Sequence, residues 1–163
     1  MRARRSADED APDWTAACVE AVAVRLLARR EHSRHELARK LAARGVPQKL
    51  VASVLTRLAE RNLQSDDRYA ESLVTSRAGR GQGPVRIRRE LVERGVASEA
   101  VEQALAGAGQ DWFDLARQVR RRRFGAAVPP DWKSRAQQSR FLEYRGFTGE
   151  QIRHALGGGE EAP

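Results

Sequence analysis

The sequence predicts an all-α protein, built as an elongated, curved tandem array of three helix-turn-helix-like repeats of three helices each. The first observation is an internal repeat: "LAARGVPQKLVASVL", "LVERGVASEAVEQAL" and "LEYRGFTGEQIRHAL" begin at residues 41, 91 and 142. The second is that apolar residues recur at helical spacing along the chain, with no strand-like alternation. A period near 50 residues is typical of stacked helical units, which bury their apolar faces only between neighbours.

Each copy of the repeat is centred on a glycine, at Gly45, Gly95 and Gly146. An arginine precedes each glycine, and leucines lie four residues before it and ten residues after it, at Leu41, Leu91, Leu142, Leu55, Leu105 and Leu156. A glycine after the last turn of a helix adopts a left-handed conformation at little cost, so each one predicts the end of a helix and a tight turn.

The first repeat is expected over residues 15–64. Its first helix covers about 15–30, where the apolar residues are Val19, Val22, Leu26 and Leu27. A second helix follows the capping sequence Ser33-x-x-Glu36 and places Leu37 and Leu41 on one face. Pro47 suits the start of the third helix, whose apolar face holds Val51, Leu55 and Leu58.

The second repeat is expected over residues 65–109. Its first helix, about 66–78, is capped by Asp66 or Asp67 and carries Tyr69, Leu73 and Val74. The looser segment "GRGQGP" leads to a helix with the pair Ile87 and Leu91, and Val101 and Leu105 mark the last helix.

The third repeat is expected over residues 110–157. Its first helix, about 111–123, carries Trp112, Leu115, Ala116 and Val119, and "GAAVPPD" follows it. Gln138 stands where the other repeats have Leu37 and Ile87, and Thr148-x-x-Gln151 is another capping sequence. Residues 1–14 are predicted to be a disordered leader and 158–163 a flexible tail.

The net charge of the 163-residue chain is +8, and the charge is unevenly distributed. Residues 115–145 hold nine arginines or lysines against Asp131 and Glu143, and residues 77–95 hold six arginines against two glutamates. Such a balance indicates a polyanionic partner, either nucleic acid or an acidic protein surface.

Sites for catalysis are not evident. "GRGQGP" lacks the following Lys-Ser/Thr and the preceding strand of a phosphate loop, and the three histidines lie far apart. Cys18, the only cysteine, is expected to be a small buried residue of the first helix. No apolar run approaches the ~20 residues that span a bilayer. We therefore expect a monomeric cytoplasmic binding protein with no enzymatic activity, cofactor, metal or small-molecule substrate.

The sharpest feature is "RQVRRRRFG", residues 117–125. A run of like charges is often only a solvated helix face, but five arginines this close repel one another and suit phosphates or carboxylates. The candidate contact residues are the arginines of both basic stretches: Arg77, Arg80, Arg86, Arg88, Arg89, Arg117, Arg120, Arg121, Arg122, Arg123 and Arg140.

Aromatic residues lie near the arginine run, at Phe124, Phe141, Tyr144 and Phe147. Stacking of nucleic-acid bases on these rings is one interpretation. The helical spacing favours core positions instead, since Phe141 and Phe147 lie at or beside the apolar positions that align across the three repeats. Trp112 and Trp132 are likewise interpreted as packing residues.

Several segments resemble the RecX regulators of the RecA recombinase. They are "SRHELARKLAARGV", "DDRYAESLVTSR", "GPVRIRRELVERGV", "DWFDLARQVRRRRFG" and "RFLEYRGFTGEQIRHAL", which follow the family's order over roughly residues 17–157. The resemblance implies a protein without catalysis that binds the RecA–single-stranded DNA filament in its helical groove. It implies inhibition of RecA ATP hydrolysis, strand exchange and co-protease activity, in recombination and SOS DNA repair, with single-stranded DNA touched directly or through RecA.

Two other functions remain open from the residues. A helix-turn-helix-type DNA-binding regulator would expose several polar residues on a recognition helix, whereas the candidate helix 48–63 is strongly apolar. A helical scaffold that binds only protein would show little affinity for random single-stranded DNA at any salt concentration.

Overall fold

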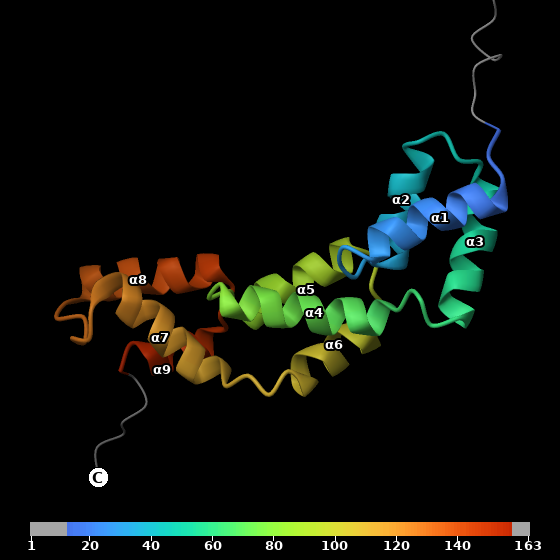
Figure 1. The fold of residues 1–163 in the computed structure, drawn as a ribbon. Helices are drawn as coiled ribbons and strands as arrows, with labels where there is room; N and C mark the ends of the chain where they lie inside the picture. The colour runs from blue at the N-terminus through green and yellow to red at the C-terminus, as the bar shows by residue number, and fades with distance from the viewer. Residues whose placement is uncertain (1–12, 158–163) are drawn as a thin grey trace, which may run out of the picture. The chain divides into compact units, whose positions relative to one another are not determined.

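The computed structural model describes residues 13–157, and all regular structure in this range is helical (Figure 1). The predicted all-α class is confirmed. The predicted leader, except residues 13 and 14, and the predicted tail lie outside the described residues. The helices are α1 (Ala16–Leu27), α2 (Arg34–Ala42), α3 (Gln48–Glu60), α4 (Asp66–Gly79), α5 (Pro84–Glu93), α6 (Ser98–Gly107), α7 (Trp112–Phe124), α8 (Trp132–Arg145) and α9 (Gly149–Ala155).

Side-chain caps fix the beginnings of several helices. The Ser33 hydroxyl accepts a hydrogen bond from the backbone N–H of Glu36 at 3.0 Å, as the capping sequence predicted. At α9 the box is complete: Gln151 donates its N–H to the Thr148 hydroxyl, and the Gln151 amide oxygen accepts from the Thr148 N–H at 2.9 Å. These bonds satisfy N–H groups that have no partner inside the helix.

The repeated glycines end α2, α5 and α8 in the same way. Gly45, Gly95 and Gly146 have φ of 79°, 76° and 91°, which confirms the predicted left-handed conformation. In each turn the residue after the glycine donates its N–H to the carbonyl of the repeated leucine five residues earlier, at 3.1–3.3 Å. The sequence repeat is therefore a repeat of one turn geometry.

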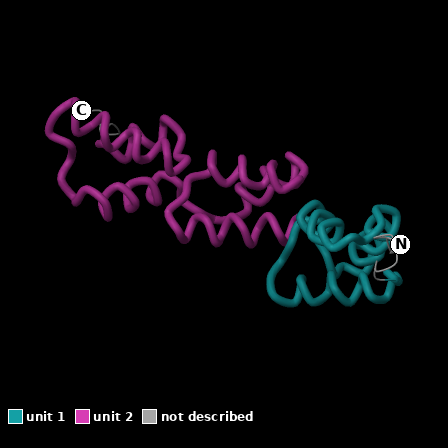
Figure 2. Tube along the Cα trace, turned by 90° about the horizontal axis from the view of Figure 1, so that it is seen from above, with its two compact units in different colours: residues 1–66 teal, residues 67–163 magenta. Residues whose placement is uncertain are grey.

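The first compact unit covers residues 1–66 (Figure 2). It has its own hydrophobic core. Helices α1 and α2 pack against α3, and the core includes Val19, Ala23, Leu37, Leu41, Val54 and Leu58, all fully buried. Asp66, the last residue of the unit, bonds to the start of α2. Its carboxylate accepts hydrogen bonds from the Arg34 N–H and the Gln64 amide, both at 2.8 Å.

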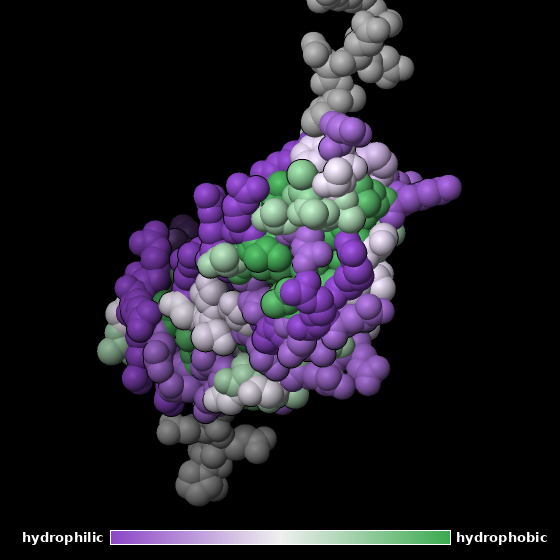
Figure 3. Space-filling view, turned by 45° about the vertical axis from the view of Figure 1, so that its right-hand side comes forward, coloured by the Kyte–Doolittle hydropathy of each residue, from purple (hydrophilic) through white to green (hydrophobic). Residues whose placement is uncertain are grey.

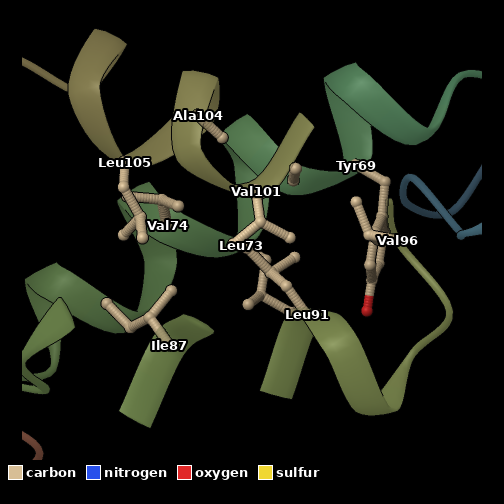
Figure 4. Packing of buried hydrophobic residues seen from close by; sticks show 10 residues of the cluster. Tyr69, Leu73, Val74, Ile87, Leu91, Val96, Val101, Ala104 and Leu105 are labelled. Carbon is tan, nitrogen blue, oxygen red and sulfur yellow. The ribbon is translucent and has the colours of Figure 1, made fainter. Parts of the chain in front are cut away.

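The second unit, residues 67–163, contains two cores. Figure 4 shows the first, where Tyr69, Leu73 and Val74 of α4 meet residues of α5 and α6: Ile87, Leu91, Val101, Ala104 and Leu105. The predicted pair Ile87 and Leu91 is fully buried.

The second core of this unit lies among α7, α8 and α9. Leu115, Val119, Leu142, Phe147 and Ile152 contribute to it. Ala78, near the end of α4, belongs to the same core, and Trp112 packs against both cores. Helix α4 therefore contributes side chains to both cores, which explains why α4–α9 form one compact unit.

The segment "GRGQGP" is a packed junction rather than a loose linker. Gly83 donates its N–H to the carbonyl of Arg145 at 2.8 Å, and Val85 donates to the carbonyl of Gly146 at 2.9 Å. A Cβ atom on Gly83 would lie 2.4 Å from the Gly146 backbone, far inside van der Waals contact. Only glycine therefore allows the α4–α5 loop to bond this closely to the turn after α8.

Two expectations about buried residues are wrong. Cys18 is exposed, because it lies on the outer face of the first turn of α1. Trp132 is 82% exposed, because it is the first residue of α8 and lies outside the buried cluster of that region. Figure 3 shows hydrophobic residues in separate patches between hydrophilic ones on the face that it presents.

Candidate functional site

Four predicted contact arginines line a single groove in the second unit. Arg77 lies in the last turn of α4, Arg80 directly follows that helix, and Arg86 and Arg89 lie on α5. The groove has a volume of about 720 Å³, and its lining also includes Val85, Glu90, Glu93, Arg94, Glu143 and Tyr144. Because α8 supplies the last two residues, the glycine junction between α5 and α8 shapes the groove.

Arg77 and Glu90 form the rigid end of this groove. The Arg77 guanidinium binds the Glu90 carboxylate through two hydrogen bonds of 2.7 and 2.6 Å, and Arg94 approaches the same carboxylate at 3.4 Å. The hydrogen bonds from Arg77 hold the pKa of Glu90 below its ordinary value, and the bond to Glu90 raises the pKa of Arg77. Arg77 is thus positioned by its partner.

Arg80, Arg86 and Arg89 differ from Arg77, since none forms an ion pair within residues 13–157. Arg86 is nevertheless held in place. Its Nη1 donates to the Tyr144 carbonyl at 3.2 Å, and its guanidinium carbon lies 5.2 Å from the centre of the Tyr144 ring. The groove therefore presents arginines without an ion-pair partner beside an aromatic ring.

Two other predicted contact residues are neutralised by neighbours. Arg88 binds Glu102 through two hydrogen bonds of 2.6 and 2.9 Å, which lower the pKa of that carboxyl. Arg117 pairs with Asp114 one turn away on α7 and lowers the pKa of that carboxyl in the same way. Both pairs lie at the surface, where such pairs add little stability.

The end of α7 presents a separate basic cluster. Arg121, Arg122 and Arg123 are exposed in the last turn of this helix, where the negative end of the helix dipole favours cations. Arg140 is exposed on α8. The structure does not bring the α7 arginines into the groove formed by α4, α5 and α8.

Arg120 is not a surface residue, and its inclusion among the contact residues needs correction. It is only 3% exposed, and its guanidinium donates to the carbonyls of Gly125, Ala126 and Ala127 and to the Gln138 amide oxygen. Burial lowers the pKa of Arg120 from its ordinary value, with a further contribution from the charge of Arg121. Arg120 fixes the α7–α8 loop.

The aromatic residues divide into core and surface. Phe147 is buried, and Phe124 and Phe141 meet edge to face with ring centres 5.3 Å apart. Tyr144 is instead 74% exposed. Sequence reasoning missed it as a groove residue, although a signal was present: its equivalents two residues before the other glycines are Ala43 and Glu93, a column without apolar bias.

No group of three or more histidine, cysteine, aspartate or glutamate residues in positions 13–157 is placed to hold a metal ion. Within the same range, no helix combines the length and apolar character of a membrane span.

Comparison with known protein families identifies all three repeats. The models described as the first, second and third three-helix domains of RecX match residues 21–58, 65–105 and 110–156. The chain belongs to the RecX family. The resemblance seen in the sequence is thereby confirmed.

Relatives named regulatory protein RecX cover most of the chain. The RecX of Halorhodospira halophila is 52% identical over 139 residues, which are 85% of this chain and 86% of that protein. The RecX of Ectopseudomonas mendocina is 48% identical over 143 residues, covering 88% of this chain and 95% of the relative. A regulatory role in DNA repair and recombination follows from this membership.

Solved RecX structures share the fold. The crystal structure of RecX from Lactobacillus salivarius superposes with a TM-score of 0.74 at 18% identity, covering 87% of this chain and 94% of that one. A second RecX crystal structure gives a TM-score of 0.75 at 20% identity, covering 87% of this chain and 72% of the other. The likeness shows that this chain shares their fold.

Proposed function

We propose that this protein binds the RecA–single-stranded DNA filament in its helical groove and mainly inhibits the ATPase, strand-exchange and co-protease activities of RecA. Membership of the RecX family is the observation that carries this proposal. The protein would act in the cytoplasm as a monomer, by binding and without catalysis.

The exposed arginines support binding to such a filament. A RecA filament combines protein carboxylates with DNA phosphates, and arginine can bind both through paired hydrogen bonds. Arg80, Arg86 and Arg89 in the groove and Arg121, Arg122 and Arg123 on α7 form no ion pair within residues 13–157. Unpaired surface cations steer association and make it depend on salt.

The proposed contact set keeps ten of the arginines selected from the sequence. Arg120 leaves the set because its side chain is buried and bonded to four oxygen atoms. Arg88 and Arg117 stay as secondary members, because a partner must first compete with Glu102 or Asp114 for them.

Co-sedimentation with RecA filaments tests the proposal. The protein should pellet with RecA assembled on single-stranded DNA in the presence of an ATP analogue, and much less with RecA that lacks nucleotide and DNA. Binding should weaken as salt rises, since surface charges contribute to it. A protein that stays in the supernatant with assembled filaments at low salt does not have the proposed function.

A further inference from the structure

We infer that the groove formed by α4, α5 and α8 is itself a binding site for single-stranded nucleic acid. In this site a base stacks on the Tyr144 ring while neighbouring phosphates bind Arg80 and Arg89. This goes beyond the proposed function, because the site needs no RecA. It gives the protein a direct hold on the strand.

The stacking platform is built in advance. Arg86 is held against α8 through the Tyr144 carbonyl, and its guanidinium lies over the Tyr144 ring. The tyrosine is still 74% exposed with this guanidinium in place, so ring surface remains available. A cation near a ring also attracts the flat face of a base and the phosphate beside it. Little side-chain freedom is lost on binding.

The phosphate contacts come from the cations that have no carboxylate partner. Arg80 and Arg89 line the groove and form no ion pair within the described residues. Arg77, in contrast, already binds Glu90 through two hydrogen bonds and serves as a fixed wall. The groove volume of about 720 Å³ lies within the ~300–1,000 Å³ of typical small-ligand sites.

The other groove residues favour an unpaired strand over an acidic peptide or a duplex. A peptide carboxylate would use the arginines and leave the aromatic ring unused. Glu93 and Glu143, which also line the groove, can accept hydrogen bonds from base amino groups. In a duplex the bases are stacked on one another, so only an unpaired base can reach the ring.

Two probes of equal charge separate stacking from attraction to phosphate. Fluorescein-labelled dT20 and an abasic 20-mer carry the same phosphates, but only dT20 has bases. Wild-type protein, without RecA, should bind dT20 at low salt at least ~10-fold more tightly than the abasic strand, since one base–aromatic stack supplies that much. Equal affinity for both probes, or no binding to dT20, would overturn the inference.

Variants of aromatic residues locate the stack. Tyr144→Ala should lose at least ~10-fold in affinity for dT20 and bind the abasic strand unchanged, while Tyr144→Phe keeps the ring and the affinity. Trp132→Ala is the matched control, because Trp132 lies on the same helix and is more exposed but does not line this groove. If Trp132→Ala weakens binding and Tyr144→Ala does not, the strand lies elsewhere.

Variants of arginines inside and outside the groove test the phosphate contacts. Arg89→Gln should weaken binding of both probes, whereas Arg29→Gln should change it little, because Arg29 is an exposed arginine of the first unit that does not line the groove. If Tyr144→Ala and Arg89→Gln bind dT20 as wild type but inhibit RecA less, the groove is a protein contact and the inference fails. The DNA assay contains no RecA, so a negative result in it would not contradict the proposed regulation of RecA. A failure to bind RecA filaments would likewise not contradict DNA binding in the groove.

Discussion

The guanidinium of Arg120 donates a hydrogen bond of 3.1 Å to the side-chain oxygen of Gln138 inside the third repeat. Gln138 occupies the column filled by Leu37 and Ile87 in the other repeats, and both of those are fully buried. The polar residue in an apolar column is therefore matched by a buried arginine on the facing helix. A buried amide or guanidinium alone would be costly, so the two residues depend on each other.

Arg120→Ala should destabilise the second unit by about 3 kcal/mol, because it leaves a cavity and four oxygen atoms without their donor. Arg121→Ala, one residue along and exposed, is the control and should cost less than ~0.5 kcal/mol. Urea unfolding of both variants measures the difference. Equal midpoints for the two would mean that the buried position of Arg120 contributes nothing to stability.

Gly83→Ala should destabilise the junction between α5 and the turn after α8. The new methyl group would overlap the Gly146 backbone, and overpacking of this kind costs about 1–3 kcal/mol. Gly107→Ala is the matched control, because a Cβ there meets no atom within 4 Å and alanine favours the helix. Thermal unfolding should show a lower Tm for the first variant only. A Tm for Gly83→Ala at or above that of wild type would refute the close contact.

Leu41→Asp should unfold the first unit, because it buries an unpaired charge in the core of that unit at a cost of at least ~3 kcal/mol. The predicted division into repeats 15–64, 65–109 and 110–157 remains a proposal. Residues 1–66 form a compact unit with a core of its own, so we expect the first repeat to unfold independently of the rest. Hydrogen exchange should show lost protection in α1–α3 and retained protection in α4–α9. Wild-type protection of α2 would contradict the core position of Leu41.

Protonation of His32 should make the first unit less stable as the pH falls from 7 to 5. The ring is 2% exposed, with Nδ1 3.0 Å from the Arg30 carbonyl, and burial lowers its pKa from 6.5. The neutral ring is therefore favoured in the fold, so its stabilisation is complete above pH 6.5 and is lost as pH falls toward the folded pKa. The nearby charges of Arg30, Glu36 and Lys40 act more weakly than burial.

Denaturant unfolding across this pH range measures the effect. His32→Gln should flatten the dependence, while His35→Gln, at an exposed position, should retain it. A first unit equally stable at pH 5 and pH 7 in the wild-type protein would show that His32 is protonated without cost.

The sequence predicted the parts of this fold that depend on local spacing. The glycine turns and the buried leucines follow from residues within fifteen positions of one another, so periodicity revealed them. The groove could not be found in this way, because Arg86 and Tyr144 are 58 residues apart and meet only through the glycine junction. The arginine run misled for a related reason: helix periodicity turns Arg120 inward while Arg121, Arg122 and Arg123 stay outside.

The most direct test of the account is inhibition of the RecA ATPase on single-stranded DNA at physiological salt. The variant Arg121→Glu, Arg122→Glu and Arg123→Glu changes only exposed side chains, so its helical content should match wild type. The control carries the same charge change on the first unit, at Arg25, Arg29 and Arg44, which are also exposed. We expect the α7 variant to inhibit at least ~10-fold more weakly than the control, equivalent to about 1.4 kcal/mol of binding. Inhibition equal to wild type would mean that these arginines are only a solvated helix face.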